Sequence, residues 1–131
     1  MSSIVIGWVP APEGRAALAY AMRESVTRGV PLRVLGAGDG QEDELAADIA
    51  LARAAAGGDP DVTVEPPPTD GRNPADVLVD VSYDDDVDLL VIGLRRRSPV
   101  GKLLMGSTSQ RVLLEADCPV VAVKPAVAPA R

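Results

Sequence analysis

The segment from Gly93 to Gln110, GLRRRSPVGKLLMGSTSQ, brings together residue types that bind phosphate. It contains three glycines, four cations and, near its end, the triplet Gly106-Ser107-Thr108, where a helix is expected to begin. A glycine turn that opens a helix directs backbone N–H groups at an anion, and the helix dipole adds a favourable potential. The segment is therefore a candidate phosphate-binding loop.

Each part of this segment also has an interpretation without a ligand. The four cations suit a phosphate clamp, but clustered charges often belong to a solvated basic loop. These cations are Arg95, Arg96, Arg97 and Lys102. A capped helix start needs the same small and hydroxyl residues as an anion site, and Ser107 and Gln110 have the spacing of a capping box. Both interpretations stay open at this point.

Composition excludes several other kinds of chemistry. The chain has no His and one Cys, so it has no internal disulfide, no zinc cluster and no Ser-His or Cys-His pair. We expect Cys118, which precedes a proline, to be a small buried hydrophobe and not a redox thiol. The net charge of -6 and the absence of Phe oppose nucleic-acid binding. The aspartates at 84–86 predict a solvated helix end, and no metal-binding pattern is present.

The size of the chain predicts one domain without a membrane span. Its 131 residues, 47% of them hydrophobic, suit a single core. The apolar runs are far shorter than the roughly 18 residues of a membrane helix, and the N-terminus lacks a basic region. We therefore expect a cytoplasmic protein, with a domain over residues 1–125 and a frayed Pro/Ala tail over 126–131.

Hydrophobic patterning predicts five strands that alternate with four helices. Nearly continuous apolar runs, typical of strands covered on both faces, occupy residues 4–9, 32–37, 88–92 and 120–123. Residues 61–65 alternate and stop at three prolines, which predicts an edge strand. Helical spacing of apolar residues predicts helices over 12–28, around 45–56, from Pro74, with Asn73 as its N-cap, and from near Ser107. The order predicts an α/β fold with helices on both faces of a parallel sheet.

In such a sheet the ligand lies beyond the carboxyl ends of the strands, which makes the loops after the first and fourth strands the candidates. Trp8, near the end of the first strand, is expected in the core and not as a ligand platform.

The spacing of Gly93, Gly106 and Ser107, followed by a helix and the sequence CPVVAVK, resembles the universal stress protein family over nearly the whole chain. The family signature is Gly, two residues, Gly, nine residues, Gly, and then Ser or Thr. Arg96 stands where this signature has its second Gly. Nucleotide-binding members resemble one another in a VDGS sequence after the first strand, whereas this chain reads WVPA with Val9 at the Asp position.

The resemblance implies a Rossmann-like three-layer sandwich, a five-stranded parallel sheet of order 3-2-1-4-5, and a crevice between strands one and four. ATP or AMP, with Mg²⁺, is the ligand that it implies. Its candidate nucleotide-binding positions here are Val9, Pro10, Ala37, Gly93, Arg95, Arg96, Gly106, Ser107 and Thr108. A lost hydrogen bond from ribose to the absent carboxylate costs roughly tenfold to a hundredfold in affinity.

These observations lead to three functional hypotheses. The first is a non-enzymatic, dimeric regulatory protein of the stress response, with a residual phosphate loop and weakened or lost ATP binding. The second is a competent ATP or AMP sensor that uses Arg96 and its neighbouring cations, and the third, a nucleotide hydrolase, lacks an obvious general base. The predicted dimer forms through the last strand, which is an apolar edge that must be covered. Its residues are Val120, Val121, Ala122 and Val123.

Overall fold

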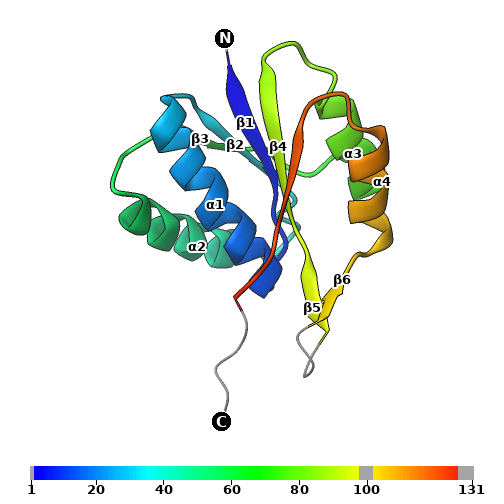
Figure 1. Ribbon diagram of the computed structural model, residues 1–131, viewed down its shortest axis with the longest axis horizontal. Helices are drawn as coiled ribbons and strands as arrows, with labels where there is room; N and C mark the ends of the chain where they lie inside the picture. The colour runs from blue at the N-terminus through cyan, green and yellow to red at the C-terminus, as the bar shows by residue number, and fades with distance from the viewer. Residues whose placement is uncertain (1, 98–101, 127–131) are drawn as a thin grey trace.

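A five-stranded parallel sheet lies between two layers of helices in the computed structural model, which describes residues 2–97 and 102–126 (Figure 1). The strands of the sheet are β1 (Ser3–Gly7), β2 (Leu32–Leu35), β3 (Val62–Val64), β4 (Val87–Gly93) and β7 (Val120–Val123). The helices are α1 (Pro12–Arg28), α2 (Glu42–Ala56), α3 (Pro74–Val81) and α4 (Ser107–Glu115). Two further strands, β5 (Arg95–Arg97) and β6 (Lys102–Leu104), form an antiparallel hairpin. The sheet order β3-β2-β1-β4-β7 confirms the predicted order 3-2-1-4-5.

The middle of the sheet is buried on both faces because β1 and β4 carry apolar side chains at consecutive positions. Successive side chains of a strand point to opposite faces. Ile4 and Ile6 accordingly belong to a core with α1 and α2, and Val5 belongs to a second core with α3 and α4. Figure 1 shows these two helical layers on either side of the sheet. The predicted three-layer α/β/α sandwich is confirmed.

Local signals in the sequence predict the ends of two helices correctly and the cap of a third incorrectly. Helix α1 ends at Gly29, which has the left-handed φ of 68° that favours glycine, and α3 is capped by Asn73, whose Oδ1 accepts from the Ala75 amide at 2.8 Å. The predicted capping box at α4 is wrong. Gly106 occupies the N-cap, Ser107 is already helical, and no side chain caps this helix.

Other boundaries differ where the chain turns away from the sheet. Strand β1 ends at Gly7 and not at residue 9, and β2 ends at Leu35 and not at residue 37. The β5–β6 hairpin lies in a segment that we expected to be a loop. Of the predicted tail over 126–131, residues 127–131 lie outside the described residues. Within the described ranges, no helix has the length and apolar character needed to cross a membrane.

A buried polar pair fixes the end of β1. Trp8 is 1% exposed, which confirms its predicted place in the core, and its indole Nε1 donates to Asp48 Oδ2 at 3.1 Å. Asp48 is a buried residue of α2. A buried hydrogen bond to a charged group contributes about 1.5 to 3 kcal/mol. The pair therefore holds the start of the β1–α1 connection against α2, and this connection forms one wall of the cavity described next.

Candidate functional site

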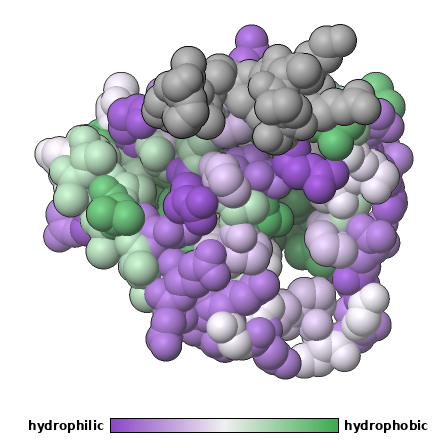
Figure 2. Space-filling model, turned by 90° about the horizontal axis from the view of Figure 1, so that it is seen from below, coloured by the Kyte–Doolittle hydropathy of each residue, from purple (hydrophilic) through white to green (hydrophobic). Residues whose placement is uncertain are grey.

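A cavity of about 660 Å³ opens at the carboxyl ends of the strands, where the sheet order reverses between β1 and β4. Its walls come from the ends of β1, β2 and β4, from the prolines that follow β3, and from α3 and the start of α4. Figure 2 looks onto this end of the molecule and shows a hollow with hydrophobic residues in its depth and hydrophilic residues around it. The cavity lies where parallel α/β sheets bind ligands, as the sequence predicted.

The start of α4 supplies backbone donors to this cavity. Gly106, Ser107, Thr108 and Ser109 line it, and the first backbone hydrogen bond of the helix runs from the Gln110 amide to the Gly106 carbonyl at 3.0 Å. Among the described residues, the amides of 107–109 have no hydrogen-bond partner. Free amides at a helix N-terminus are suited to phosphate oxygens.

The two described glycines of the predicted signature have different roles. A Cβ on Gly93 would lie 2.2 Å from the backbone oxygen of Glu13, so glycine is required there for α1 to pack against β4. A Cβ on Gly106 would meet no atom within 4 Å, and the backbone at φ -75° and ψ 171° suits any residue. The protein's own packing therefore explains Gly93, whereas Gly106 leaves room beside the free amides.

The cavity also has apolar lining residues. Val9, which is 43% exposed, and Ala37, which is buried, line it together with Val77 and Leu78 of α3. The β1–α1 connection thus brings an alkyl group and no carboxylate to the wall at position 9. Pro10 is exposed and does not line the cavity, so the structure does not bring this predicted site residue to the others.

Charged side chains at the cavity include several that the sequence reasoning missed. Arg95 was predicted and lines the cavity, while the side chains of Arg96, Arg97 and Lys102 lie outside what the structure describes. The unpredicted charges are Glu13, Glu65 and Arg72. The place of Glu13 in the first turn of the helix after β1 was the one available signal, because that turn faces the carboxyl ends of the strands.

Two of these charges are already engaged within the protein. Glu65 accepts from Arg33 Nε at 2.5 Å and from its Nη2 at 3.2 Å, and this hydrogen bonding is the main reason that the pKa of Arg33 is raised. Arg72 donates to the carboxylate of Asp80 and, at 3.3 Å, to the backbone oxygen of Asp76. These pairs fix the proline segment beside β2 and α3, and they leave Glu13 and Arg95 as the charged lining residues without an ion-pair partner in the described part of the chain.

A further ion pair joins the helices that flank the cavity. The guanidinium of Arg111 on α4 contacts the carboxylate of Asp76 on α3 and lies 3.3 Å from Glu115. Hydrogen bonding to Asp76, followed by that to Glu115, raises the pKa of Arg111. Because these side chains are largely exposed, we assign the pair a role in aligning α3 with α4 and not a large stabilisation.

The remaining reactive residues do not form a site. Cys118 is half-buried, and this burial raises the pKa of its thiol, which agrees with the predicted structural role. The aspartates at 84–86 are exposed, as expected, and Asp84 lies 3.8 Å from Arg33. Across residues 2–97 and 102–126, no cluster of three or more His, Cys, Asp or Glu side chains could hold a metal ion.

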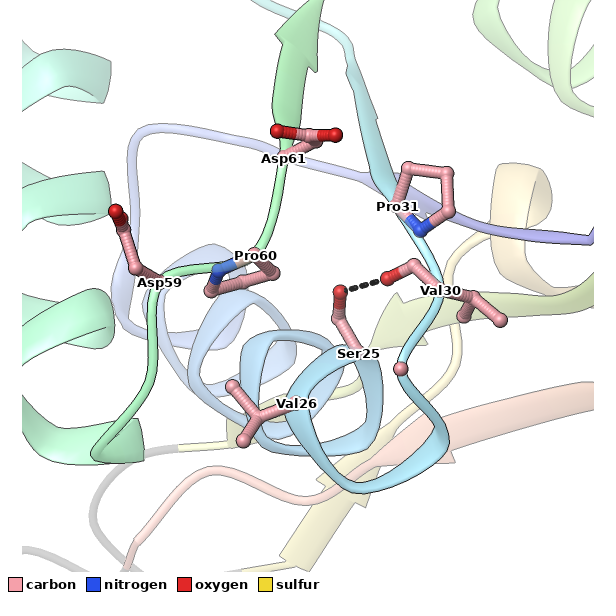
Figure 3. Close-up of a pocket in the computed structure, with 8 residues that line it drawn as sticks. Ser25, Val26, Val30, Pro31, Asp59, Pro60 and Asp61 are labelled. Atoms are coloured by element: carbon pink, nitrogen blue, oxygen red, sulfur yellow. Dashed lines mark hydrogen bonds between the residues drawn. The ribbon is translucent and has the colours of Figure 1, made fainter.

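A smaller cavity of about 310 Å³ lies at the other end of the sheet, between the end of α1 and the starts of β2 and β3. Figure 3 shows the Ser25 hydroxyl donating to the Val30 carbonyl within it. The Asp59 carboxylate is paired with Arg53 at 2.6 Å. Ligands of parallel sheets bind at the carboxyl ends and not at this amino end, so this cavity is not the candidate site.

Comparisons with a family model, with related sequences and with solved structures all indicate the same family. A family model of the universal stress protein family matches residues 35–124. A universal stress protein of Mycolicibacterium smegmatis is 39% identical over 129 residues, which cover 93% of this chain and 97% of that protein. The structure of a universal stress protein from Archaeoglobus fulgidus superimposes with a TM-score of 0.74 at 29% identity, covering 95% of this chain and 99% of that one. A universal stress protein in complex with cAMP has a TM-score of 0.69 at 25% identity, with coverages of 95% and 98%.

Proposed function

The chain belongs to the universal stress protein family, and on that premise we propose that it is a non-enzymatic regulatory protein of the stress response. Its ligand in this proposal is an adenine nucleotide that binds in the cavity at the carboxyl ends of the strands, with weakened affinity for ATP. The observation that carries the proposal is the set of α4 amides at residues 107–109, which have no hydrogen-bond partner among the described residues and lie at a cavity of about 660 Å³.

Two further observations support an AMP-type ligand held weakly. The apolar lining residues Val9, Ala37 and Val77 suit a nucleobase, and the related universal stress protein in complex with cAMP is 25% identical to this chain. The lining offers an alkyl group at position 9, where a carboxylate would accept from a ribose hydroxyl. Loss of a hydrogen bond to a charged group costs about 1.5 to 3 kcal/mol, or roughly tenfold to a hundredfold in affinity.

The proposal is tested by calorimetric titration with AMP and adenosine, which differ in the phosphate alone. We expect AMP to bind at least about tenfold more tightly, because its phosphate accepts from the α4 amides and adenosine has no group to replace it. Equal affinities for AMP and adenosine would contradict phosphate binding at α4. An absence of heat with both ligands would contradict nucleotide binding by the protein.

A competent ATP sensor is the second candidate, and the position of Arg95 at the cavity favours it. A guanidinium can form two hydrogen bonds to a phosphate. ATP titrated with and without Mg²⁺ separates the two candidates. Tighter binding of ATP than of AMP would support the sensor, whereas weaker binding of ATP would support the proposal above.

The absence of catalysis is part of the proposal. The chain has no His, and of the two carboxylates that line the cavity in the described part of the chain, Glu65 is held by Arg33. Overnight incubation with ATP should therefore release no more phosphate than a buffer control, and steady turnover that co-purifies with the protein would revive the hydrolase hypothesis.

We also propose that the protein is a homodimer joined through β7. Within residues 2–97 and 102–126, this strand pairs with β4 alone, so its other edge has backbone groups that no described strand pairs. Its four residues are half-buried and apolar. The opposite edge, β3, is exposed and is followed by three prolines, which protect it. Dimerisation through β7 would cover the apolar edge with a twin strand.

Light scattering at micromolar concentration should give twice the 13.6 kDa mass of one chain. Ala122→Lys, in the middle of β7, should shift the mass towards the monomer, while Thr63→Lys in β3 serves as a matched edge-strand control. A monomeric mass for the unmodified protein, or equal dimerisation of both variants, would contradict the β7 interface.

A further inference from the structure

The four described charged side chains that line the large cavity do not make a strongly cationic site. Two are acidic and two are basic, and two of the four, Glu65 and Arg72, are held by partners within the protein. Among these four described residues, Arg95 is thus the cation available to a ligand, and Glu13 is the available carboxylate. A phosphate in this cavity therefore meets one unpaired charge of each sign among these residues.

Glu13 lines the cavity beside the end of β4. It is in the first turn of α1, and its backbone oxygen and Cβ are the atoms that a Cβ on Gly93 would meet at 2.2 and 3.0 Å. Gly93 ends β4 and leads directly to Arg95. Glu13 is also half-buried, so water screens its charge less than that of a fully exposed carboxylate.

A fixed negative charge beside a phosphate site repels a ligand in proportion to the ligand's own negative charge. Within a Debye length of about 8 to 10 Å this repulsion is only partly screened. For a partly exposed site, each additional negative charge on the ligand should weaken binding roughly threefold to tenfold. Arg95 opposes this effect, but as an exposed side chain it is screened more than Glu13.

We propose that Glu13 is a specificity-determining residue that makes the cavity select phosphate groups of low negative charge. This inference rests on the proposed nucleotide site and specifies its ligand class: cyclic and simple monophosphates bind in preference to free polyphosphates. A triphosphate enters mainly when a divalent cation has lowered its charge.

The test compares cyclic AMP, AMP and ATP by calorimetric titration, with ATP measured both with and without Mg²⁺. These ligands share the adenosine part and carry about one, two and four negative charges, respectively. The unmodified protein should bind them in the order cyclic AMP, AMP and Mg²⁺-free ATP, and Mg²⁺ should improve ATP binding. Glu13→Gln should reduce the affinity ratio of cyclic AMP to free ATP by about tenfold or more.

Glu42→Gln is the matched control. Glu42 occupies the first turn of α2, as Glu13 occupies that of α1, and it is exposed and lies outside the cavity. Both variants change the net charge and the charge at a helix N-terminus by the same amount. The control should retain the ratio of the unmodified protein, and raising the salt concentration should lower that ratio in the unmodified protein but hardly in Glu13→Gln.

The outcomes separate this inference from the proposed function. Equal changes for all three ligands in Glu13→Gln, or the same change in Glu42→Gln, would overturn the charge selection while nucleotide binding stands. If Glu13→Gln binds these nucleotides and the unmodified protein does not, the result would support charge selection by Glu13. It would contradict nucleotide binding as the function of the unmodified protein. No binding by either protein would overturn both.

Discussion

Gly93→Ala is expected to lower the free energy of unfolding by about 1 to 3 kcal/mol, which is a substantial part of the roughly 5 to 15 kcal/mol typical of a domain. The added methyl would lie 2.2 Å from the backbone oxygen of Glu13 and 2.7 Å from its carbonyl carbon. A backbone group cannot rotate away as a side chain can, so the start of α1 must move off β4. That movement would also open the buried packing of α1 residues such as Leu18.

Urea unfolding followed by circular dichroism measures this effect. The midpoint should fall while the denaturant slope stays close to that of the unmodified protein, because the amount of surface exposed on unfolding is nearly the same. Gly106→Ala is the matched control, because it makes the same chemical change at a position with no atom within 4 Å. An unchanged midpoint for Gly93→Ala would mean that α1 adjusts freely, and the structural role of Gly93 would be wrong.

The arrangement of the sheet was predictable because its signals are local. Buried parallel strands appear as continuous apolar runs, and the run of β1 and the run of β4 each contain residues that are fully buried in the structure. Helix ends were predictable where one residue decides them, as at Gly29 and Asn73. The order of the strands was different, because it came from the resemblance to a family and not from any pattern within the chain.

The missed features depend on contacts between residues that are distant in the sequence or on backbone geometry. Glu13 and Gly93 are 80 positions apart, so no periodicity links Glu13 to the end of β4 that its backbone contacts. The β5–β6 hairpin pairs Arg96 with Leu103, and neither three arginines nor KLL shows the alternation that predicts a strand. At α4 the Ser107 to Gln110 spacing matched a capping box, but the helix begins one residue earlier and Gly106 takes the cap position.

Of the predicted site residues, Gly93, Arg95, Gly106, Ser107 and Thr108 line one cavity, because β4 and α4 are joined by a short segment. Pro10 does not, because the chain after Val9 turns outward before α1 begins. An apolar β1–α1 connection therefore contributes Val9 to the cavity but not its neighbour.

Gly106→Ala is expected to separate ligand binding from folding. Its backbone lies in a region that alanine adopts without strain, and the new methyl meets no atom of the protein within 4 Å. Alanine is a poorer N-cap than glycine, so stability should fall by no more than about 1 kcal/mol. The methyl would, however, stand beside the free amides of residues 107–109, where a phosphate must approach closely.

AMP binding by this variant should therefore be weaker by at least about tenfold, the equivalent of one lost charge-assisted hydrogen bond, while the urea midpoint stays near that of the unmodified protein. Calorimetric titration and urea unfolding of the same preparation measure the two effects together. Unchanged AMP affinity would place the phosphate away from α4. A large loss of stability would instead mean that the fold requires glycine at 106, because the added methyl would then clash with other atoms of the protein.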